Sequence, residues 1–263
     1  MSTTQATSAT QQGRLVADRK ALVLAGALGV IGFIALVVAS AFHPSGIDNN
    51  NHPAVFAQYA QSVGWTAVHL AEFAAMAITI TGLLVLFCVL NLADGIPSLG
   101  ARIGIVSAGV ALALTAVRFA VDGVVLKRAV DAWAGAPDPE KAARFANAET
   151  VRWLEEAITS YQSFLLGLTL ILLAALIVWT ARVPRPIAYL LALGGVGYVV
   201  AGWIVGVAGL APQGAIPTYV AQLAPVIASI YLLIVAWRTP RFAVKPAGER
   251  YACEPASEAR LLS

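Results

Sequence analysis

The chain has 263 residues, of which 59% are hydrophobic and only 12% are charged, and its mean hydropathy is +0.78. A soluble domain usually carries about 25% charged residues, so this composition excludes a water-soluble globular protein, and the surplus apolar surface must face lipid. The net charge of +3 comes from basic residues that cluster at the ends of apolar runs. That distribution suits a lipid bilayer as the partner and argues against nucleic acid, which calls for a basic stripe interleaved with exposed aromatics.

The N-terminal segment is polar and of low complexity, with the run STTQATSATQQG at residues 2–13. We expect residues 1–20 to form a disordered cytoplasmic tail. The first apolar run follows, and it ends in Ala39-Ser40-Ala41, which imitates the cleavage site of a signal peptide. The run is about 20 residues long, whereas the apolar part of a signal peptide has about 7 to 15. An uncleaved span is therefore favoured, with cleavage as the alternative.

Six apolar runs reach the roughly 20 residues that a helix needs to cross a bilayer core. Transmembrane strands would be shorter and alternating, so the sequence predicts an all-α integral membrane protein with a six-helix bundle. The membrane domain is expected over residues 21–238, followed by a cytoplasmic tail at 239–263. The predicted spans are approximately 21–42, 66–92, 103–126, 154–181, 186–210 and 219–237.

Lys and Arg are distributed unevenly between the two sides of these spans. Eleven of the 17 basic residues flank one side, whereas the other side has five, all in the acidic loop between the third and fourth spans. Because basic residues are retained in the cytoplasm, both termini are predicted to be cytoplasmic. We expect the host to be the cell membrane, most consistent with a bacterial cytoplasmic membrane.

The first external loop reads HPSGIDNNNHP over residues 43–53. His43 ends the first span because the residue before proline avoids helical geometry, and the Asp-Asn run is typical of a turn. His52 and Pro53 are expected at the N-cap and first position of a short helix over 54–62. The loop is thus predicted to be a lid over a polar pocket.

Two stretches before even-numbered spans resemble each other, namely FAQYAQSVGW at 56–65 and FANAETVRW at 145–153, with a fainter echo at 217–225. They suggest that the bundle is a repeat of helical hairpins, as is common in membrane transporters. Chance similarity in alanine-rich sequence is the alternative.

Ionisable side chains inside spans are costly, so each is a candidate site. Those of this chain share one depth near the external boundary, which predicts a pocket that opens outward. The pocket residues are His69, Glu72, Arg118, Asp122, Glu155, Glu156 and Gln222. The metal-ligand candidates are His43, His69 and Glu72.

Each candidate has a structural interpretation beside the functional one. His69 and Glu72 are spaced i, i+3, which permits joint metal binding or orientation of the imidazole by the carboxylate. Arg118 and Asp122 are spaced i, i+4, so they neutralise each other unless Arg118 turns into the pocket. The adjacent Glu155 and Glu156 diverge by about 100° on a helix, so one is expected to face the bundle and the other solvent or Arg152.

Three classes of function are compatible with these residues. The first is binding or transport of a small polar molecule or lipid head group. The second is a metal- or haem-dependent membrane enzyme or redox protein, although His43 with His69 is the only axial pair. The third is an accessory subunit whose polar layer satisfies itself. Common soluble catalytic and nucleotide-binding motifs are absent, so the sequence favours binding over catalysis and identifies no cofactor or oligomeric state.

Overall fold

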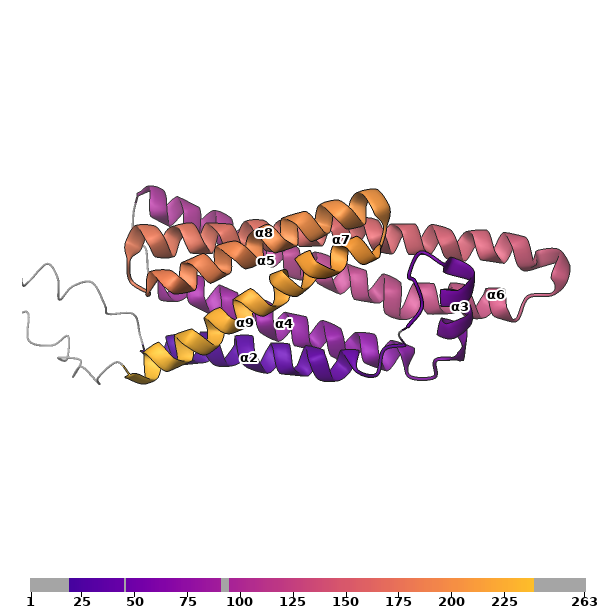
Figure 1. Ribbon diagram of the computed structural model, residues 1–263, viewed down its shortest axis with the longest axis horizontal. Coiled ribbons are helices and arrows are strands. Elements are labelled where there is room, and N and C mark those ends of the chain that lie inside the picture. Colours follow the sequence, from indigo (N-terminus) through magenta and orange to yellow (C-terminus); the bar gives the residue numbers. More distant parts are fainter. Residues whose placement is uncertain (1–18, 45, 91–94, 239–263) are drawn as a thin grey trace, which may run out of the picture.

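The computed structural model describes residues 19–44, 46–90 and 95–238 (Figure 1). Within these residues the secondary structure is helical, without strands. The helices are α2 (Arg19–Ser40), α3 (His52–Gln61), α4 (Trp65–Val89), α5 (Ile96–Ala120), the π-helix η2 (Val121–Leu126), α6 (Lys127–Ala134), α7 (Asp138–Thr180), α8 (Arg185–Ala208), the 3-10 turn η3 (Pro212–Gly214) and α9 (Ala215–Arg238). The expected tails lie outside the described residues.

Six of the helical segments are long and apolar enough to cross a membrane. The segments α5, η2 and α6 follow one another without a break and make up one of the six. The prediction of an all-α, six-span membrane bundle is therefore confirmed. The positions of the spans along the chain also agree with the apolar runs, although several ends differ.

The six spans are arranged as a ring in sequence order. Each span packs mainly against its two neighbours along the chain, and α9 returns to pack against α2, which closes the ring. Short connections favour this antiparallel arrangement of consecutive helices. Arg19 Nε donates a hydrogen bond to Ala236 O at 2.8 Å, so α2 begins where α9 ends. We call this the terminal end of the bundle.

Glycines allow the neighbouring spans to approach closely. A Cβ atom added to Gly195 of α8 would lie 2.9 Å from the backbone oxygen of Gly167 in α7. A Cβ atom on Gly197 would lie 2.8 Å from the backbone nitrogen of Ala221 in α9. Because lipid provides no hydrophobic drive between helices, such backbone contacts carry much of the packing energy.

The opposite end of the bundle carries a cap. The helices α6 and α7 form a hairpin that projects beyond the other spans, and α3 packs against α6 beside it (Figure 1). Their interface is a separate apolar cluster, made of Val55, Phe56, Tyr59, Trp65, Leu126, Ala129, Val130 and Ala148. We call this the cap end.

Two helices extend beyond the predicted spans. The third predicted span, 103–126, lies within the helical segment Ile96–Ala134, and the fourth, 154–181, overlaps Asp138–Thr180. Charged pairs at i, i+4, such as Glu140 with Arg144, stabilise the polar part of the longer helix. The short helix is His52–Gln61, since Asn51 rather than His52 caps it by accepting from Ala54 N.

The proposed repeat remains a prediction, and the two similar stretches adopt different structures. Residues 56–65 cross from α3 into α4 through a break, whereas residues 145–153 lie within the uninterrupted helix α7.

Candidate functional site

The ring encloses a central cavity of about 490 Å³ in its cap-end half. All six spans contribute to its wall, including Ser40 of α2, Glu72 of α4, Arg118 of α5, Gln162 of α7, Tyr198 of α8 and Gln222 of α9. This volume lies within the range of about 300–1,000 Å³ that is typical of small-molecule sites.

Two further cavities adjoin the central one. The cap cavity, of about 320 Å³, shares Ser40, Glu72 and Arg118 with it and is also lined by His69, Asp122, Arg152 and Glu155. The apolar cavity, of about 60 Å³, shares Leu36, Met76 and Tyr198 with it and extends toward the terminal end between α2, α4 and α9. Polarity therefore falls from the cap end toward the middle of the bundle.

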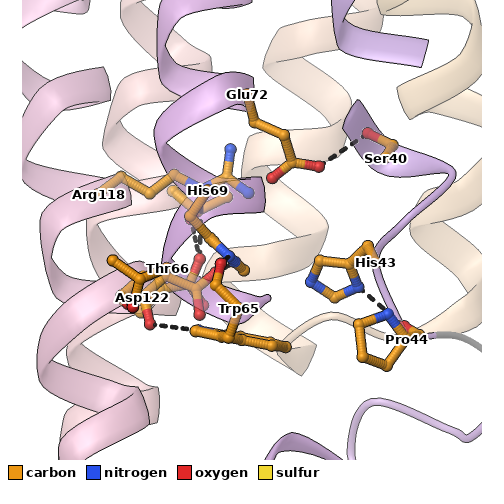
Figure 2. A network of polar contacts seen from close by, with 12 residues as sticks. Ser40, His43, Pro44, Trp65, Thr66, His69, Glu72, Arg118 and Asp122 are labelled. Atoms are coloured by element: carbon orange, nitrogen blue, oxygen red, sulfur yellow. Dashed lines mark hydrogen bonds and ion pairs between the residues drawn. The ribbon is translucent and has the colours of Figure 1, made fainter. Parts of the chain in front are cut away.

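His69 and Asp122 form a buried pair that joins α4 to η2 (Figure 2). His69 Nδ1 lies 2.8 Å from the carbonyl oxygen of Trp65, and Nε2 lies 3.1 Å from Asp122 Oδ2. A carbonyl only accepts hydrogen bonds, so Nδ1 carries a proton. Nε2 of the neutral ring would then be an acceptor facing a second acceptor. The pair must hold one more proton, either on Nε2 or on the carboxylate.

The π-helix positions Asp122 and its neighbours. Hydrogen bonds in a π-helix run from residue i to i+5, and isolated π turns are frequent at functional sites. Here α4 donates to two backbone oxygens of this segment, from Trp65 Nε1 to Asp122 O at 2.9 Å and from Thr66 Oγ1 to Gly123 O at 2.7 Å. A Cβ atom on Gly123 would lie 2.7 Å from His69 Cβ. Glycine is therefore needed for the contact with His69.

Two arginines are held by two glutamates of α7. Glu155 is fully buried and lies 3.3 Å from Arg118 Nε and 3.4 Å from Arg152 Nη1. Glu156 accepts from Arg152 Nε at 3.2 Å. Thr159 Oγ1 also donates to Glu155 Oε1 at 2.8 Å. The charges of these two arginines and two glutamates therefore balance within the cap end of α5 and α7.

Glu72 occupies a different environment. Its side chain lines both the central and the cap cavity, and Ser40 Oγ donates to its Oε1 at 2.8 Å (Figure 2). Among the described residues, no Lys, Arg or His nitrogen lies within 4.0 Å of this carboxylate.

The structure brings most of the predicted pocket residues together. His69, Glu72, Arg118, Asp122 and Glu155 line the cap cavity. Gln222 lines the central and apolar cavities, and Glu156 lines a separate hollow at the surface beside Asn50 and His52. Their role in ligand binding remains a prediction.

The pairing of these residues differs from the simplest expectation. Arg118 pairs with Glu155 on α7 and not with Asp122, and its side chain lines the cavities. Glu155 is fully buried and lines the cap cavity, and Glu156 contacts Arg152, which is one of the two alternatives expected for it. Glu155 also contacts Arg152.

Each of the predicted metal ligands contacts another protein group. His43 Nδ1 faces Pro44 O at 2.8 Å, and both ring nitrogens of His69 contact protein groups. In the part of the chain that the structure describes, no three His, Cys, Asp or Glu side chains are grouped to hold a metal ion. The geometry thus gives no support to a metal at His43, His69 and Glu72, nor to haem between the two histidines, whose ring centres are 5.2 Å apart.

Arg152 was expected only as a partner of Glu155 or Glu156 and was not included among the pocket residues. Only 2% of its surface is exposed, and its side chain lines the cap cavity. Its spacing of i+3 and i+4 from Glu155 and Glu156 was the signal that could have found it. Tyr59 of α3 was missed as well. It also lines the cap cavity, and burial raises its pKa to about 12, so its phenol keeps its proton at neutral pH.

Residues 23–236 match the family described as "Domain of unknown function (DUF4386)", and this range contains all six spans except the first residues of α2 and the last of α9. Neither the curated proteins nor the solved structures contain a match to the chain.

Proposed function

The chain belongs to the DUF4386 family, and we propose that it is a multi-pass membrane protein that binds an amphipathic ligand inside its ring of helices. The ligand's polar group, either that of a small molecule or a lipid head group, occupies the central cavity. Its apolar part extends into the apolar cavity. The observation that carries this proposal is a central cavity of about 490 Å³ with walls from all six spans.

The shape of the interior favours binding over passage across the membrane. Toward the terminal end the space narrows to the apolar cavity, whose wall is formed by residues such as Leu83, Leu86 and Leu232. A polar substrate has no hydrophilic route through that half of the described bundle.

The proposed orientation places the cap end outside the cell and both termini in the cytoplasm of the cell membrane. The excess of Lys and Arg beside the terminal end supports it. The adjacency of the first and last described helices at that end is consistent with it.

A cavity-filling variant tests the function. The protein is reconstituted in phosphatidylcholine nanodiscs, and its thermal unfolding midpoint is measured with n-octylammonium, n-octanol or n-octanoate. At least one probe is expected to raise the midpoint of the wild type. The same probe should not raise the midpoint of Ala201→Phe, because residue 201 lines the central cavity and the larger side chain would fill it.

Val200→Phe is the matched control, since Val200 adjoins Ala201 on α8 but is 41% exposed on the lipid side. This variant should respond like the wild type. If no probe stabilises the wild type, or if Ala201→Phe responds as the wild type does, the proposed function is wrong.

A further inference from the structure

Glu72 is a buried carboxylate without a cation among the described residues. It is 8% exposed, and Ser40 Oγ supplies its one hydrogen bond within that part of the chain. Removing one partner from a buried ion pair costs several kcal/mol because the remaining charge is left uncompensated. A carboxylate in this position therefore calls for a positive charge from elsewhere.

The neighbouring charges are already matched. His69 and Asp122 hold a proton between them, and the two arginines are paired with Glu155 and Glu156. Arg118 is a cation on the wall of the same cavity, but its Nε atom is engaged by Glu155 at 3.3 Å. Glu72 is thus the unmatched charge of the cluster.

The Glu72 carboxylate therefore lines the central and the cap cavity without a cation from the described residues. We propose that the ligand is an organic ammonium compound with an apolar substituent, whose cationic nitrogen pairs with Glu72. This inference rests on the proposed function and names the chemical class of its ligand.

The apolar substituent fits the other side of the cavity. Met76 lies one helical turn from Glu72, and it lines both the central and the apolar cavities together with Leu36 and Leu166. An alkyl chain directed from Glu72 toward the terminal end would follow these residues. An anionic ligand would instead place a second unmatched negative charge beside Glu72.

The three octyl probes in phosphatidylcholine nanodiscs also test this inference, because they share one chain and differ in the charge of the head group. Octylammonium is expected to stabilise the wild type, with octanol and octanoate giving at most a tenth of its apparent affinity. Glu72→Gln should reduce the affinity for octylammonium at least tenfold. Glu72→Asp, which keeps the charge, should retain the preference for ammonium.

Glu140→Gln is the matched control, since Glu140 lies on the exposed hairpin and pairs with Arg144; it should bind like the wild type. Circular dichroism and size exclusion identify a variant that fails to fold, and the comparison of the three head groups on the wild type then decides the outcome.

Equal stabilisation by octanol or octanoate, or unchanged octylammonium binding in Glu72→Gln, would overturn the ammonium assignment. In each of these cases, loss of binding in Ala201→Phe would still uphold the proposed function. Absence of binding by every probe would overturn both.

Discussion

Glu72 and Asp122 are both buried carboxylates near the cap end, but of these two only Asp122 has a cationic partner within reach among the described residues. Substitution by the corresponding amide should therefore change the free energy of unfolding in opposite directions at the two positions. The comparison is informative because the two residues lie on neighbouring helices and line the same cap cavity.

Glu72→Gln is expected to stabilise the ligand-free protein by about 1 kcal/mol, since it removes an unpaired buried charge and keeps an acceptor for Ser40. The measurement is the free energy of unfolding in a detergent titration. A decrease in this free energy would show that Glu72 is already matched in the ligand-free state.

Asp122→Asn is expected to destabilise the protein by about 1–3 kcal/mol, because His69 Nε2 loses its charged partner. His69→Gln removes the other half of the pair. The free energy of unfolding of the double variant should therefore fall by less than the sum of the decreases in the two single variants. Strict additivity in this cycle would contradict the proton-sharing pair.

Single residues also show what the sequence could and could not predict. His69, Glu72, Arg118 and Asp122 were grouped at one depth from their positions in the spans, and they do lie around one cavity. Their partners were not predictable, because the pairing of His69 with Asp122 depends on the packing of α4 against η2. Arg152 was missed because a charge was taken as the end of a span, whereas neighbouring glutamates stabilise it in the helix.

At the scale of the elements, the helices extend beyond the apolar runs that predict them. Hydropathy reports where the bilayer lies, whereas a helix ends where its backbone groups are capped or its chain must turn. For α7 this difference amounts to the segment from Asp138 to Trp153. Nothing in the sequence indicated the π-helix η2, since this helix depends on hydrogen bonds that the Trp65 and Thr66 side chains of α4 donate to its backbone oxygens.

Gly123→Ala tests the role of this π-helix. The added Cβ atom would lie 2.7 Å from His69 Cβ, so we expect a loss of about 1–3 kcal/mol from overpacking and displacement of the His69 ring. The readout is the unfolding free energy together with octylammonium binding.

Gly109→Ala is the control on the same span, because no described atom of a neighbouring element lies within 4 Å of the position that its methyl group would take. Alanine is favoured over glycine in a helix by about 1 kcal/mol, so this variant should be neutral or stabilised. A neutral outcome for Gly123→Ala would contradict the close contact with His69.

At the scale of the whole molecule, the ring explains why a six-span protein has an interior. Helices in consecutive order around a closed ring leave a shared space along its axis, and here every span contributes to the central cavity. The number of spans followed from the sequence, but the closure between α9 and α2 did not, since no local pattern encodes a contact between the ends of the chain.

The orientation in the membrane gives a prediction for the whole chain. A green fluorescent protein fused to either terminus should fluoresce, because both termini are expected in the cytoplasm. Alkaline phosphatase inserted at Gly135, in the turn between α6 and α7, should be active only if that turn is outside. Active phosphatase at the termini would reverse the orientation.

The central claim is that the ring binds one amphipathic ammonium compound in its interior. Native mass spectrometry of the 27.4 kDa chain released from nanodiscs with octylammonium tests this claim most directly. The account predicts a single added molecule on the wild type and on Val200→Phe, and none on Ala201→Phe or Glu72→Gln. Equal adducts on all four proteins, or none on the wild type, would contradict it.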